Sequence, residues 1–194
     1  MNQIKVGIAQ IYAHPSFNDK VLSALAEPVI TDEKISLSSL ELGDIGFDIR
    51  ENIQTKYNKY FKKKLECILE YFNGKEIDIL IFPEYTIPPE ALKLLYDYSI
   101  QNNIIIVAGS HTVLKKYENI YTDIKLHGIN LEITSENSDV RKSIAPIFIG
   151  ESDNTQYIEK ITQSSWEVHN PSGSKWDLIK FNINNRKINV AIQL

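Results

Sequence analysis

The chain lacks any apolar run long enough to cross a bilayer, although 43% of its 194 residues are hydrophobic. Its first residues lead straight into a predicted strand and show no signal peptide's apolar core followed by small residues. A basic excess is also missing, because the net charge is −4, which is unlike a general nucleic-acid binder. These absences predict a cytoplasmic protein with neither a membrane nor a nucleic acid as its partner.

Cysteine is almost absent, since Cys67 is the only one and no intrachain disulfide can form. Cys67 lies within a stretch, Tyr57–Phe72, whose apolar residues recur at helical spacing. An activated thiol usually needs a helix N-terminus or a cationic neighbour. A cysteine in the middle of a helix is more often a small packing residue, and the pattern predicts that role for Cys67.

Several motifs that would define a site are missing as well. The sequence contains no Gly-x-Gly-x-x-Gly, no phosphate loop and no Gly-x-Ser-x-Gly. Its four histidines are scattered without metal-ligand spacing. His111 follows Gly109 and Ser110 at the end of a predicted strand. It is either a pocket residue or an ordinary polar loop residue.

The first half of the chain alternates apolar strands with helices. A long stretch, Tyr12–Asn52, has prolines, glycines and mixed charges, and it is interpreted mainly as an elaborated loop. The order of the other elements predicts parallel neighbouring strands with helices packed against the sheet. The predicted elements are the strand Ile4–Ile11, the helix Ile53–Phe72 ended by Asn73 and Gly74, the strand Ile77–Phe82, a helix from Pro88 to about Gln101, and the strand Ile104–Ala108.

The second half is predicted to be rich in strands. Asn184 and Asn185 form a plausible tight turn between the last two strands. No internal repeat or domain linker is visible, so the whole chain is interpreted as one α/β unit. The predicted strands are Asn119–Leu126, Gly128–Ile133, Ala145–Ile149, Thr155–Ile158, Trp176–Ile183 and Lys187–Leu194.

Glu84 is the first candidate for chemistry. It follows a nearly continuous apolar strand, and the C-terminal edge of a parallel sheet is where α/β proteins place their sites. Partial desolvation between Phe82 and Tyr85 would raise the pKa of a carboxyl there and suit a general base. The alternative is an ordinary loop glutamate.

Several segments together resemble the nitrilase, or carbon–nitrogen hydrolase, superfamily. The apolar strand followed by Phe82, Pro83 and Glu84 is similar to the family's first signature, and the segment around Lys160 is similar to the one that bears its catalytic lysine. The segments that carry the resemblance, in order, are Val6–Gln10, Ile79–Glu84, Ile104–Gly109, Tyr157–Ile161, Ser165–Glu167 and Ile188–Leu194.

The resemblance implies an incomplete α-β-β-α sandwich, the N-terminal portion of one hydrolase domain, with a Glu-Lys-Cys triad. Glu84 would be the general base and Lys160 would stabilise the oxyanion, while the nucleophilic cysteine is expected just after Leu194. Glu167 would be a supporting carboxylate, and Tyr85 would line the pocket together with His111. The substrate would be a small amide, with no metal and no cofactor.

The resemblance also implies association, either as a homo-oligomer or with the missing C-terminal portion. Two other functions stay open. One is a non-catalytic nitrilase-like module that binds a ligand or a partner, and the other is an unrelated α/β ligand-binding domain. In that last case Glu84 would merely lie at a sheet edge. Without the resemblance, Lys160 is interpreted as a solvated charge at the end of a strand.

Overall fold

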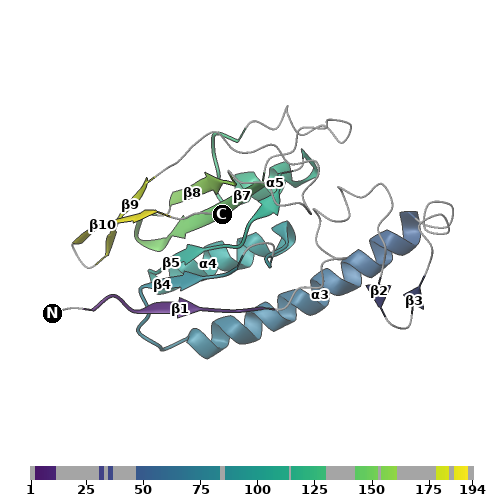
Figure 1. Cartoon of the computed structure of the whole chain (residues 1–194), viewed down its shortest axis with the longest axis horizontal. Helices are drawn as coiled ribbons and strands as arrows, with labels where there is room; N and C mark the ends of the chain where they lie inside the picture. Colours follow the sequence, from purple (N-terminus) through teal and green to yellow (C-terminus); the bar gives the residue numbers. More distant parts are fainter. Residues whose placement is uncertain are drawn as a thin grey trace.

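A six-stranded mixed sheet forms the centre of the structure, with strand order β1-β4-β5-β7-β6 and with β8 paired to β7 (Figure 1). β1 (Val6–Ile8), β4 (Ile79–Ile81) and β5 (Ile105–Val107) are parallel neighbours, as predicted. The computed structural model describes residues 3–11, 31–32, 35–36, 47–83, 86–113, 115–129, 143–152, 154–160, 178–183 and 186–191.

The other half of the sheet is antiparallel. β7 (Ser143–Ile149) runs against β5, and β8 (Asn154–Glu159) runs against β7. β6 (His111–Thr112) pairs with β7 on the same side as β5 does. Val107 pairs with Ile147, and His111 pairs with Ile144. The chain therefore advances four residues from β5 to β6 while β7 advances only three. Residues 108–110 therefore form a bulge, which locally bends the strand.

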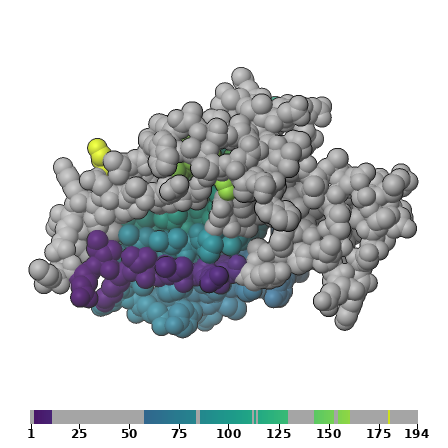
Figure 2. Space-filling model, in the orientation of Figure 1, coloured from purple at the N-terminus to yellow at the C-terminus, as the bar shows by residue number. Residues whose placement is uncertain are grey.

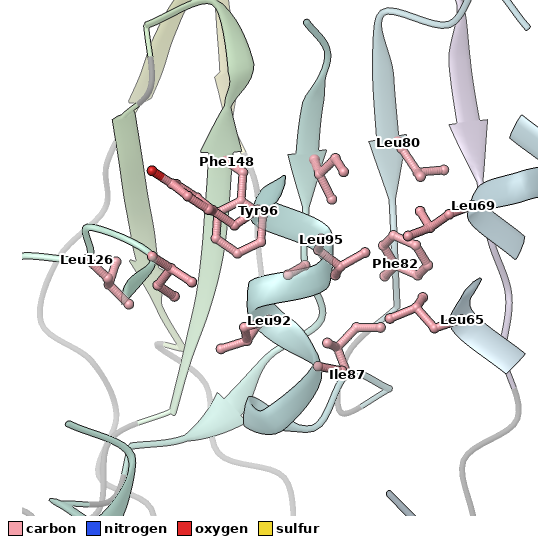
Figure 3. Close-up of a cluster of buried hydrophobic side chains, with 14 of the residues drawn as sticks. Leu65, Leu69, Leu80, Phe82, Ile87, Leu92, Leu95, Tyr96, Leu126 and Phe148 are labelled. Carbon is pink, nitrogen blue, oxygen red and sulfur yellow. The ribbon is translucent and has the colours of Figure 1, made fainter. Parts of the chain in front are cut away.

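Two helices pack on one face of the sheet, namely α3 (Phe47–Phe72) and α4 (Leu92–Asn102). Alternate strand residues such as Leu80, Ile106 and Phe148 point toward them. Figure 3 shows Leu80 and Phe148 on the same side of the sheet as Leu65, Leu69, Leu92 and Leu95 of the helices.

The helices end where sequence signals predict. α3 stops at Phe72, and Gly74 behind it has a φ of +74°. Asn103 closes α4 in the left-handed conformation, with a φ of 52°. No helix among the described residues is both long and apolar enough to span a membrane.

Smaller elements complete the described parts. They are the short pair β2 (Thr31–Asp32) and β3 (Ile35–Ser36), the single turns η2 (Pro89–Ala91), η3 (Lys115–Tyr117) and η5 (Gly150–Ser152), the helix α5 (Glu118–Asp123), and the hairpin β9 (Leu178–Ile183) with β10 (Arg186–Ala191). The antiparallel pairing of the last two strands confirms the predicted hairpin, whose turn lies outside the described residues.

The opposite face of the sheet is almost entirely aliphatic. Its buried side chains are Ile79, Ile105, Val107, Ile147, Ile149 and Ile158. The same face continues onto β1, where Val6 is 50% exposed and Ile8 is 70% exposed. In Figure 2 the purple residues of β1 lie uncovered along the side shown. The side chains on this face are therefore buried at β5 and β7 but exposed at β1.

The prediction of a strand over Asn119–Leu126 was wrong, because most of this stretch is helix α5. Its β-branched and aromatic residues suggested a strand. However, Tyr117, Tyr121 and Ile124 recur at helical spacing, and all three are buried. Of the strand predicted over Gly128–Ile133, residues 128 and 129 are not in a strand and the rest lies outside the described residues.

Two predictions about α3 also need correction. The helix begins at Phe47 instead of Ile53, so the end of the stretch interpreted as a loop is helical, with acidic residues in its first turns. Cys67 is exposed, not packed in the core. The buried stripe of α3 runs through Phe61, Leu65 and Leu69, and Cys67 lies outside it.

We expect Leu95→Ala to lower the free energy of unfolding by about 3 kcal/mol, because it leaves a cavity in a packed core. Leu95 is fully buried between α4 and the sheet. Gln101→Ala, an exposed position on the same helix, is the matched control and should change stability by less than about 0.5 kcal/mol. Urea unfolding measures both, and equal losses would contradict the packing described here.

Candidate functional site

The ends of several strands meet at one edge of the sheet. β4 and β5 are parallel, and β8 points the same way because β7 lies antiparallel between β5 and β8. Pro83 follows β4, Gly109 follows β5 and Lys160 follows β8. The backbone N–H of Lys160 donates to the carbonyl of Ser143 at 2.8 Å, which extends the β7–β8 ladder to this edge. The topology thus brings the predicted lysine to the edge at which the strand before Glu84 ends.

The backbone just before Glu84 is tightly held. The Thr86 hydroxyl donates to the Pro83 carbonyl at 2.6 Å. Gly109 packs against the same carbonyl, and a Cβ at that position would lie 2.1 Å from the Pro83 oxygen. Only glycine lets the two strand ends approach this closely.

Three of the predicted site residues, Glu84, Tyr85 and Glu167, lie outside the described residues. The neighbours of the first two are described, because Pro83 and Thr86 flank them and are joined by the hydrogen bond above. This hydrogen bond therefore holds the two described residues on either side of the segment close together.

Lys160 is buried, with only 8% of its surface exposed, so it is not a solvated charge at a strand end. Strand alternation puts it on the side of Ile158, which belongs to the aliphatic face away from the helices. A buried ammonium is costly unless polar or charged groups compensate it. Chemically, a lysine ammonium in a poorly solvated place can stabilise negative charge that develops during a reaction.

His111 lies at the same edge but on the helix side of the sheet. Its imidazole is 2% exposed and stacks on Tyr121 of α5, with ring centroids 5.8 Å apart. Its Nε2 lies 3.2 Å from the Tyr121 hydroxyl. The histidine and Lys160 therefore share an edge but point to opposite faces. Burial lowers the pKa of His111 to about 3, which keeps the ring neutral at ordinary pH.

The fold should lose stability as the pH falls from about 6.5 to about 3, because only the unfolded chain then takes up a proton on this ring. We expect a loss of about 1.4 kcal/mol per pH unit from His111. Urea unfolding at several pH values measures it, and His111→Gln should flatten the dependence. His127→Gln, at an exposed position, is the control. Equal pH slopes for wild type and His111→Gln would contradict the prediction.

Sequence reasoning missed three residues that shape this edge. Thr86 had a local signal, since a hydroxyl three residues after a carbonyl often bonds to it. Gly109 was noted only as the end of a strand, although its role is close contact with a segment distant in sequence. Tyr121 has a local signal only for its helix, in its helical spacing from Tyr117 and Ile124, and none for its contact with His111.

Among the described residues, no group of histidine, cysteine and acidic side chains is arranged to hold a metal ion. Comparisons with family models, with curated proteins and with solved structures each found no match to the chain. The site is therefore interpreted from its own residues and from the resemblance in the sequence.

Proposed function

We propose that the chain is the N-terminal portion of a nitrilase-superfamily hydrolase that cleaves a small amide in the cytoplasm. The observation that best supports this is a buried lysine at the sheet edge where the strand before Glu84 ends. Solvated surface lysines are common, but a lysine that is 8% exposed is not. The order of the sequence segments supports the same family.

The proposed fold is an α-β-β-α sandwich. In such a sandwich, one face of each sheet carries helices and the other carries apolar side chains that meet a second sheet. The described sheet has one face under α3 and α4 and one aliphatic face. A second sheet, from the C-terminal portion or from another copy of the chain, is the proposed cover for the β1 end.

The proposed reaction converts a primary amide and water to a carboxylic acid and ammonia. A cysteine directly after Leu194 attacks the amide carbon as its thiolate, and the carbon–nitrogen bond then breaks to leave a thioester. Glu84 takes the thiol proton, passes it to the leaving amine, and later activates the water that hydrolyses the thioester. Lys160 stabilises the oxyanion in both halves, and Glu167 supports it.

The first test is to sequence the native gene across codon 195. A cysteine codon followed by further α/β sequence is expected. The full-length product should then release ammonia from short primary amides, and Glu84→Gln should abolish this release. Cys67→Ser is the matched control, because this exposed thiol on α3 has no role in the proposal. A different residue at 195, or unchanged turnover by Glu84→Gln, would overturn it.

A non-catalytic binding module is the second candidate. It is favoured by one observation, which is that the single cysteine of these 194 residues is exposed on α3 and not at the sheet edge. In that case Glu84 and Lys160 would bind a ligand or a partner without cleaving it. Ammonia release from amides by the full-length protein would reject this candidate.

A further inference from the structure

The contact between His111 and Tyr121 has no part in the proposed chemistry, yet it lies beside the bulge that faces Pro83. It joins β6 to α5 through a stacked pair of rings with an interplanar angle of 21°. The Nε2 atom of His111 and the Tyr121 hydroxyl, 3.2 Å apart, add a polar link that fixes the orientation of the imidazole. The start of β6 is therefore linked to helix α5 through this pair of side chains.

This arrangement is costly for stability. The Nδ1 atom of His111 and the hydroxyl of the adjacent Ser110 are both buried, and neither has a hydrogen-bond partner among the residues that the structure describes. Each buried polar atom left without a partner costs about 1–3 kcal/mol. Most buried polar groups are satisfied, and departures of this kind collect where geometry serves a site.

A short series of contacts connects His111 with the backbone before Glu84. His111 pairs with Ile144 of β7, directly after the bulge at residues 108–110. Gly109 in that bulge is pressed against the Pro83 carbonyl, which Thr86 also holds. A shift of the histidine therefore moves Gly109, and with it the support of the backbone that leads into residue 84.

We propose that His111, anchored by Tyr121, is a positioning residue that acts through Gly109 to set the place of the Pro83 carbonyl, which is the last described point of the backbone before residue 84. The inference rests on the proposed function for its catalytic meaning. Its structural content is independent of that function, because a displaced strand end can be observed without a substrate.

The structural test compares the amide ¹H and ¹⁵N resonances of the full-length protein in wild type and Tyr121→Phe. The amide resonances of Gly109 and Thr86 are expected to shift, together with the imidazole ¹⁵N signals of His111. Tyr98→Phe is the control, because it also removes one hydroxyl, which donates to the Leu69 carbonyl at 3.0 Å on α3. Shifts at Gly109 and Thr86 no larger than those in the control would overturn the proposal.

His111→Gln provides a second variant in case Tyr121→Phe does not fold. The glutamine amide can reach the tyrosine as Nε2 does, so Gly109 and Thr86 should keep nearly their wild-type resonances, whereas His111→Leu should shift them. Equal spectra for the two variants would overturn the proposal.

The kinetic test uses the full-length protein and short primary amides. Tyr121→Phe should lower kcat about tenfold or more while KM changes little, because a misplaced base slows the chemical step. An unchanged kcat would overturn the positioning role. Failure of the proposed function has a different signature, because Glu84→Gln would then leave turnover unchanged.

Discussion

Gly109→Ala is expected to lower the free energy of unfolding by about 3 kcal/mol and to displace the backbone before Glu84. The new Cβ would lie 2.1 Å from the Pro83 oxygen and 2.8 Å from the Thr86 hydroxyl. The first of these neighbours is backbone, which cannot rotate away as a flexible side chain can. Relief therefore requires the ends of β4 and β5 to separate.

Gly74→Ala is the matched control for this prediction. Gly74 has a φ of +74°, and beyond its two chain neighbours no atom lies within 4 Å of an added Cβ. It should cost only about 1–2 kcal/mol, from backbone conformation alone. Urea unfolding gives both values. A loss for Gly109→Ala that does not exceed the loss for Gly74→Ala would show that the strand ends are not in close contact.

Lys160→Met is expected to reduce amide hydrolysis by the full-length protein at least about 10²-fold, mainly in kcat. Methionine has a similar length but no charge, so the packing is kept while the stabilisation of the oxyanion is lost. Lys160→Arg should not restore the rate, because a planar guanidinium does not replace a compact ammonium in a buried place. Steady-state ammonia release measures these effects.

The control for this prediction is Lys180→Met, since Lys180 is an exposed lysine on β9. It should retain the wild-type rate. Circular dichroism on each variant shows whether the fold is intact. A folded Lys160→Met protein with a wild-type rate would contradict the role given to this residue.

The part of the fold that could be predicted from the sequence is the part decided by continuous apolar runs and by end signals. Strands β4 and β5 are buried on both faces, so their composition alone indicated a parallel arrangement. Gly74 marked the end of α3 through a local backbone requirement. The α5 region could not be assigned in this way, because its aromatic and β-branched residues favour a strand while its spacing favours a helix.

The candidate site was predictable only where strand order brings residues to one edge. The contacts that shape this edge are non-local: Gly109 against Pro83, and His111 against Tyr121 of another element. No periodicity in the sequence reports such contacts. The burial of Lys160 could not be predicted for the same reason. It depends on what covers the aliphatic face of the sheet and not on the neighbouring residues in the chain.

The pairing of β1 with β4 has a consequence for the order in which the chain folds. Val6 lies beside Ile79, whereas the β4–α4–β5 unit is built from contiguous residues. Bringing β1 next to β4 closes the long segment between them, and this costs conformational entropy before the contacts between the two strands can compensate it. We expect β4, α4 and β5 to form the folding nucleus and β1 to dock late, although β1 precedes them in the chain and leaves the ribosome before them.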